Sequence, residues 1–189
     1  GPEKIIFQFD NVLAQLSFTY LVAFLLLKKT PLTQGIIALL FIIISDLLYR
    51  FFPVSGFDQA FVAGQNFGAW FNIFISGYEY GGHWAAFNAV PTAAHTLWGL
   101  MAGQLLMGNT TASYKLKRLW WAAALCLLLG VLSSFFTPVI KRIATTSFIF
   151  LSGGWTIAAL SVSYWLIDVK SYIKKTLVFR VVGINPLFI

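Results

Sequence analysis

Long runs of apolar residues alternate along this chain with short segments that contain lysine, arginine, proline or glycine. Runs without any Lys, Arg, Asp or Glu include 30–45, 84–114, 119–136 and 143–167. They approach or exceed the roughly 20 residues that an α-helix needs to cross the hydrocarbon core of a bilayer. The pattern therefore predicts membrane-spanning helices.

The polar segments between these runs indicate where the helices end. Asp10 and Asn11 are both good N-cap types for the first helix, the Lys28-Lys29-Thr30-Pro31 segment ends it, and Pro91 is tolerated in a first turn. Five complete helices and a truncated sixth are predicted, at about 11–27, 32–52, 88–107, 119–136, 144–167 and 176–189. The expected fold is an all-α, polytopic transmembrane helix bundle that forms one integral membrane domain over 1–189.

Both ends of the sequence suggest a fragment of a longer protein. The chain begins with Gly1-Pro2 rather than methionine, and it ends at Ile189 within an apolar segment that has barely begun. We therefore expect further segments on either side.

The longest connection, 53–82, is rich in glycine, phenylalanine and tyrosine, and Asp58 and Glu79 are its only charged residues. Its part at about 67–75 is expected to lie in the membrane interface or to re-enter the membrane.

Lysine and arginine are retained on the cytoplasmic side of membranes. One side collects nine of them: Lys28, Lys29, Lys115, Lys117, Arg118, Lys170, Lys174, Lys175 and Arg180. The other side has four: Lys4, Arg50, Lys141 and Arg142. Loop 53–82 is therefore expected outside, in the periplasm, a lumen or the cell exterior; the resemblance given below adds the expectation of a bacterial inner membrane.

Composition narrows the classes of function. With 59% hydrophobic and 10% charged residues, the chain is far more apolar than soluble domains, and the bilayer is its expected surroundings. The net charge of +7 comes from cations placed between apolar runs, so nucleic acid is not an expected partner. The single cysteine, Cys126, gives no disulfide framework and no metal-ligand spacing, and no metal is expected.

His95 is the first candidate site residue, about seven residues or roughly 10 Å into its helix. Ionisable residues at such depth usually face a bundle interior or a wet cavity. Two interpretations stay open: a neutral histidine bonded to a neighbouring helix, or a proton acceptor or substrate ligand beside Asn88. Asn185 is either a cap or helix breaker at the start of the sixth helix, or part of the lining of the same cavity.

Asp46 and Arg50 are spaced i to i+4, with the acid first, near the outer end of the second helix. They form an ion pair within the helix, or Arg50 binds substrate. Gly99 and Gly103 make a GxxxG pair that favours close helix packing, and Gly153-Gly154 favours packing or bending.

Four segments, read in order, resemble the membrane acyltransferases of the heparan-alpha-glucosaminide N-acetyltransferase family, in particular its uncharacterised bacterial branch. VLAQLS at 12–17 resembles the family's early VLQRIALxYLLA helix, and NFGAWFN at 66–72 resembles its NLAAYxD segment. AFNAVPTAA at 86–94, with Gly99 and Gly103, resembles the STIPAIxxxLxGxxAG helix, and VGINPLFI at 182–189 resembles GMNxLxxY. Asn72 stands where better-known members have aspartate, and GGHW at 81–84 stands where they show Asp-Pro-Glu-Gly.

The resemblance implies transfer of an acetyl group from acetyl-CoA, or another acyl-CoA, to a sugar or glycan acceptor across the membrane. It places the family's catalytic histidine upstream of residue 1, so the fragment alone is expected to be inactive. Asn88, His95 and Asn185 would line a shared cavity, and Lys115, Lys117 and Arg118 would contact the CoA phosphates. A transporter for a sugar or lipid-linked precursor and a non-catalytic membrane subunit remain alternatives, and a homo-oligomer stays open.

Overall fold

The computed structural model describes residue 9 and residues 11–172, and these contain helices but no strand. The α-helices are α1 (Val12–Leu26), α2 (Pro31–Arg50), α3 (Phe67–Ser76), α4 (Ala89–Met107), α5 (Ala112–Ser134) and α6 (Thr146–Tyr164). Short 3₁₀ turns lie at Gly81–His83 and Ala86–Asn88, and a π-helical turn, Trp165–Val169, follows α6. The all-α helix bundle is confirmed. The predicted sixth helix at 176–189, and Asn185 within it, lie outside the described residues.

Side-chain caps explain where several helices begin. The side chains of Asn11, Thr30, Asn66 and Thr111 accept hydrogen bonds from backbone N–H groups in the first turns of α1, α2, α3 and α5. The predicted start of the helix at 119–136 was wrong, because α5 begins at Ala112 directly after its Thr111 cap. The charged residues that suggested a loop instead occupy the first two turns of α5, where long cationic side chains can reach water.

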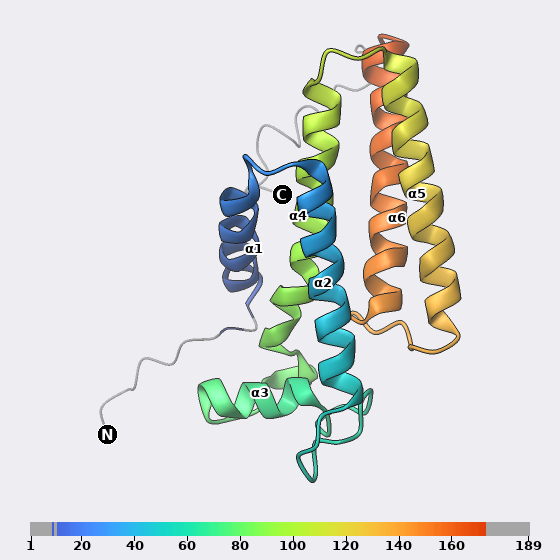
Figure 1. The fold of residues 1–189 in the computed structure, drawn as a ribbon. Helices are drawn as coiled ribbons and strands as arrows, with labels where there is room; N and C mark the ends of the chain where they lie inside the picture. Colours follow the sequence, from blue (N-terminus) through green and yellow to red (C-terminus); the bar gives the residue numbers. More distant parts are fainter. Residues whose placement is uncertain (1–8, 10, 173–189) are drawn as a thin grey trace.

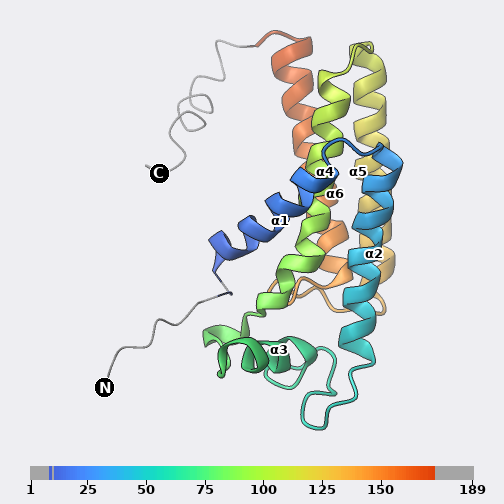
Figure 2. The ribbon, with the colours of Figure 1, turned by 60° about the vertical axis from the view of Figure 1, so that its left-hand side comes forward.

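Helix α4 lies at the centre of the bundle, where it contacts α1, α2, α5 and α6, and α6 packs along α5 (Figures 1 and 2). Helix α3 lies across one end of the bundle, beside the last turn of α2 (Figure 1). The buried core between α2, α4 and α6 is apolar and includes Ile42, Leu97 and Ile149.

In the described part of the chain, three helices are long and apolar enough to cross a membrane: Pro31–Arg50, Ala112–Ser134 and Thr146–Val169. This indicates an integral membrane protein. Helix α1 is apolar too, but its 15 residues fall short of that length. Lys28 and Lys29 lie in the turn that ends it.

Helices approach closely at Gly130, Gly153 and Gly154, and the predicted packing role of Gly153-Gly154 is confirmed. A Cβ atom on Gly130 would lie 2.7 Å from Leu151 Cγ, and one on Gly154 would lie 2.8 Å from Leu127 Cγ, so α5 and α6 approach each other through missing side chains. Trp98 of α4 packs over Gly153 in the same way. The prediction that Gly99 and Gly103 bring helices together was wrong for the described residues, since a Cβ at either position would meet none of them within 4 Å.

Candidate functional site

Buried amide side chains join distant segments at the end of the bundle where α4 begins. Asn88 is 3% exposed, and its Nδ2 donates to the Arg142 carbonyl oxygen over 3.3 Å. Its Oδ1 accepts a hydrogen bond from Nε2 of Gln15 on α1. The backbone N–H of Ala85 donates to the same Arg142 carbonyl over 3.2 Å. Asn88 therefore ties α1 and the α5–α6 connection to the start of α4.

Asn72 forms the second half of this amide cluster. It is 1% exposed on α3, and its Nδ2 donates to the Trp84 carbonyl oxygen over 2.7 Å. Its Oδ1 accepts from the Ala86 backbone N–H over 2.9 Å. The Asn72 amide thus uses both its donor and its acceptor on the backbone of residues 84–86, and it fixes this segment just before α4. Neither Asn72 nor Gln15 was a predicted site residue; the only signal for them was an amide within an otherwise apolar segment.

An imidazole–carboxylate pair lies in the connection that leads from α3 to α4. Nδ1 of His83 is 2.5 Å from Oε1 of Glu79, and the two side chains are 48% and 31% exposed. His83 has a left-handed backbone with φ of 58°, which a residue with a side chain rarely adopts. Because the carboxylate accepts the Nδ1 proton, Nε2 of a neutral His83 is an acceptor, and it has no hydrogen-bond partner among the described residues.

Gly64 allows this pair to lie against the preceding loop. Its backbone has φ of 74°, and a Cβ there would be 3.5 Å from both carboxylate oxygens of Glu79. A residue with a side chain would be strained at this φ, and its Cβ would be in van der Waals contact with the carboxylate. The loop therefore covers one side of the pair.

His95 lies in a different place from Asn88. Asn88 occupies the N-cap position at the start of α4 and His95 lies within the helix, seven positions or about 10 Å further on, and the two residues bond different neighbours. Nε2 of His95 is 2.9 Å from the Ile149 carbonyl oxygen and 3.2 Å from Ser152 Oγ, both on α6. The described residues thus bring His95 to α6 and Asn88 to α1, and they do not bring the two into one cluster.

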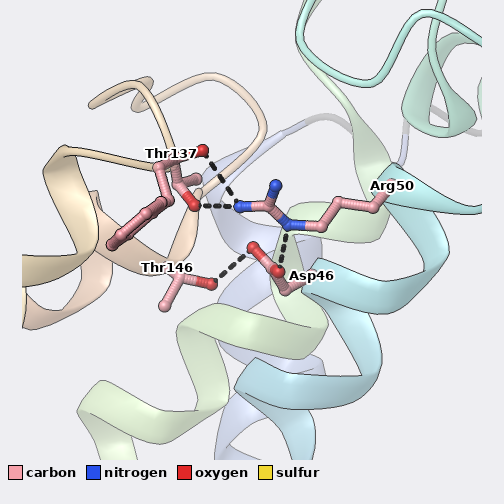
Figure 3. Close-up of polar contacts among 5 residues, drawn as sticks. Asp46, Arg50, Thr137 and Thr146 are labelled. Atoms are coloured by element: carbon pink, nitrogen blue, oxygen red, sulfur yellow. Dashed lines mark hydrogen bonds and ion pairs between the residues drawn. The ribbon is translucent and has the colours of Figure 1, made fainter.

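Asp46 and Arg50 form the predicted ion pair, and the pair extends to two further elements (Figure 3). Arg50 Nε is 2.5 Å from Asp46 Oδ2, while its Nη2 donates to the Phe136 carbonyl oxygen over 3.2 Å and to Thr137 Oγ1. Thr146 Oγ1 donates to Asp46 Oδ1 over 3.0 Å. The end of α2 is thereby joined to the α5–α6 connection and to the first residue of α6, which gives both residues a structural role.

Arg50→Met is expected to lower the free energy of unfolding by about 1–3 kcal/mol, because Asp46 loses its partner and the two bonds to the α5–α6 connection disappear. In an Asp46→Asn background the same change should cost less, since no unpaired carboxylate remains. Unfolding of the purified protein in detergent would measure both. Equal losses in the two backgrounds would contradict coupling between Asp46 and Arg50.

The three predicted CoA-binding cations lie at the other end of the bundle, on the first turns of α5. Lys115 Nζ donates to the Leu106 carbonyl oxygen at the end of α4 over 2.7 Å, where a cation stabilises a helix C-terminus. Arg118 Nε donates to Tyr114 Oη over 3.0 Å, and its guanidinium lies over the Tyr114 ring. Lys117 is exposed. Lys117 and Arg118 thus reach the surface, whereas Lys115 caps its neighbour.

Among the described residues, no three His, Cys, Asp or Glu side chains gather closely enough to hold a metal ion.

Comparison with known proteins gives no relative: no protein-family model, no curated protein and no solved structure matches the chain. The case for a function therefore depends on the residues themselves.

Proposed function

We propose that this chain is part of a membrane-bound acyltransferase that moves an acetyl or other acyl group from acyl-CoA to a sugar or glycan acceptor. The end of the bundle that carries α3 faces outward, and the protein lies in the bacterial inner membrane. Lys28, Lys29 and the α5 cations mark the opposite, cytoplasmic end. The whole protein, rather than this chain alone, carries out the reaction.

The observation that carries this proposal is that three segments resembling the acyltransferase family meet at one place. Segment 12–17 supplies Gln15, segment 66–72 supplies Asn72, and segment 86–94 supplies Asn88. Gln15 bonds to Asn88, and Asn72 bonds to the backbone of Ala86 two residues before it. Segments that resemble one family in sequence order are therefore also neighbours in space, as parts of one site would be.

The chemistry of acyl transfer suits the imidazole beside this cluster. The histidine that the resemblance places upstream of residue 1 takes the acyl group from acyl-CoA, and CoA leaves as the free thiol. The hydroxyl or amine of the acceptor then loses its proton to Nε2 of His83 while its oxygen or nitrogen bonds to the acyl carbonyl carbon. The bond from that carbon to the upstream histidine breaks, and the proton returns from His83 to that histidine. Glu79 holds the imidazole in the required tautomer and stabilises the imidazolium that forms, as carboxylates do in catalytic triads. Lys117 and Arg118 are proposed to contact the phosphates of acyl-CoA at the cytoplasmic end.

The experiment that tests the function uses full-length protein in proteoliposomes, radiolabelled acetyl-CoA on the cytoplasmic side, and amino sugars or glycans on the outer side. We expect labelled acceptor, and we expect His83→Gln to lower the rate about 10²–10⁴-fold, the usual contribution of a general base. Gly103→Ala, in open space on α4, is the control that should keep full activity.

The possible outcomes test the catalytic role of His83 separately from the acyltransferase activity of the protein. A fully active His83→Gln protein would remove His83 from the mechanism. The absence of transfer to every acceptor would refute the acyltransferase proposal, and uptake of a sugar without covalent change would favour the transporter.

A further inference from the structure

A cleft between α4 and α6 lies apart from the amide cluster and is not used by the proposed reaction. Its volume is about 180 Å³, and its lining is formed by His95, Trp98, Gly99, Ala102, Gly153, Thr156, Ile157 and Leu160. The residues from Gly153 to Leu160 are central in the predicted span Thr146–Val169, so the cleft lies at the depth of the hydrocarbon core. It reaches the protein surface at Gly99 and Thr156, which are exposed.

The missing side chain of Gly99 keeps this cleft open. A Cβ on Gly99 would meet no atom of the described residues 9 and 11–172 within 4 Å, so these residues leave the space beside it open. At one end of the cleft, Trp98 packs against Gly153 and brings α4 and α6 into contact. Beyond this contact the lining is small or aliphatic, and none of its residues is Lys, Arg, Asp or Glu.

His95 supplies one specific polar group. Its Nε2 lies 2.9 Å from the Ile149 carbonyl oxygen, which can only accept, so Nε2 carries a proton. In the neutral imidazole the other nitrogen, Nδ1, is then an acceptor. Nδ1 has no hydrogen-bond partner in the part of the chain that the structure describes.

The ligand that complements these groups has an O–H donor and an apolar body. An ester or ketone would present an acceptor to another acceptor, and a phosphate or carboxylate would enter an apolar region without a cation to pair with it. Water at this depth is scarce. A cleft of 180 Å³ has room for the volume of about six water molecules, at about 30 Å³ each, which suits a hydroxyl group with a short length of chain.

We propose that the α4–α6 cleft binds an uncharged, membrane-dissolved alcohol, with its hydroxyl donating to Nδ1 of His95 and its chain lying against Trp98, Ile157 and Leu160. The site goes beyond the acyltransferase proposal and does not depend on it. It explains why a glycine without a packing role is placed on the central helix.

The test uses the full-length protein in lipid nanodiscs and a diazirine-bearing octanol as the probe, with the labelled peptides found by mass spectrometry. We expect labelling of the peptides that contain residues 95–102 and 153–160. Unlabelled octanol should suppress it, and octane, which lacks the hydroxyl, should do so about fivefold more weakly, as the loss of one hydrogen bond predicts.

Two glycines one turn apart give a matched pair of variants. Gly99→Leu fills the cleft and should abolish labelling, whereas Gly103→Leu, equally unobstructed but outside the cleft, should leave it intact. His95→Phe keeps an aromatic ring without the acceptor and should weaken labelling about fivefold. Equal competition by octanol and octane, or labelling that survives Gly99→Leu, would overturn the proposal. Neither result depends on acyl transfer.

Discussion

Replacing Asn72 with aspartate is expected to lower the free energy of unfolding by about 3 kcal/mol, although the two side chains have almost the same shape. The Asn72 amide donates to the Trp84 carbonyl oxygen and accepts from the Ala86 N–H. A carboxylate still accepts from the Ala86 N–H, but its other oxygen faces the Trp84 carbonyl oxygen, and the two oxygens repel each other. Residue 72 is 1% exposed, so water cannot relieve this repulsion. Unfolding of the purified protein in detergent at neutral pH would measure the loss.

Asn66→Asp is the matched control for this prediction. Asn66 is also buried and lies on the same segment, but its Oδ1 caps α3, where a negative charge is favourable. Asn66→Asp also loses a hydrogen bond, the one that Nδ2 donates to the Val62 carbonyl oxygen. Because the new charge strengthens the cap, however, Asn66→Asp should cost less than Asn72→Asp. If both cost the same, burial alone would account for the effect and the contact with Trp84 would not.

The Asn72 result also bears on the resemblance to the acyltransferase family, whose better-known members have aspartate at the corresponding place. In this chain the surrounding backbone offers one acceptor and one donor, and only an amide satisfies both.

Gly154→Ala is expected to lower the free energy of unfolding by about 1–3 kcal/mol, the usual cost of overpacking. The new Cβ would lie 2.8 Å from Leu127 Cγ and 2.9 Å from the Leu127 backbone nitrogen, so a rotamer change alone cannot relieve the contact. Helices α5 and α6 would have to separate along their interface. Gly130→Ala should have a similar effect, because its Cβ would lie 2.8 Å from the Leu151 backbone nitrogen.

The same substitution at Gly103 provides the control, because its Cβ would enter open space and alanine favours the helix by up to about 1 kcal/mol. The predicted effects of Gly154→Ala and Gly103→Ala therefore differ in sign. Thermal unfolding in one detergent would compare them. A destabilising Gly103→Ala together with a neutral Gly154→Ala would contradict the packing described for α5 and α6.

The sequence by itself determined the class of fold and most helix positions, because both depend on local properties. Apolar runs of sufficient length predict α2, α5 and α6, and the cap candidate Asn11 marks the beginning of α1. The Asp46–Arg50 pair was also predictable, since i to i+4 spacing brings the two side chains together within one helix. The start of α5 was not, because charged residues within a first turn look like part of a loop.

Tertiary structure alone decided which residues from different segments meet. Gln15 and Asn88 are 73 positions apart, and their contact depends on how α1 is placed against α4. All four glycines at 99, 103, 130 and 154 lie in helices, but only the rotation and separation of the helices decide that Gly130 and Gly154 face a neighbour while Gly99 borders a cleft. Spacing along one helix carries no information on these distances, because they depend on the packing of whole helices against one another.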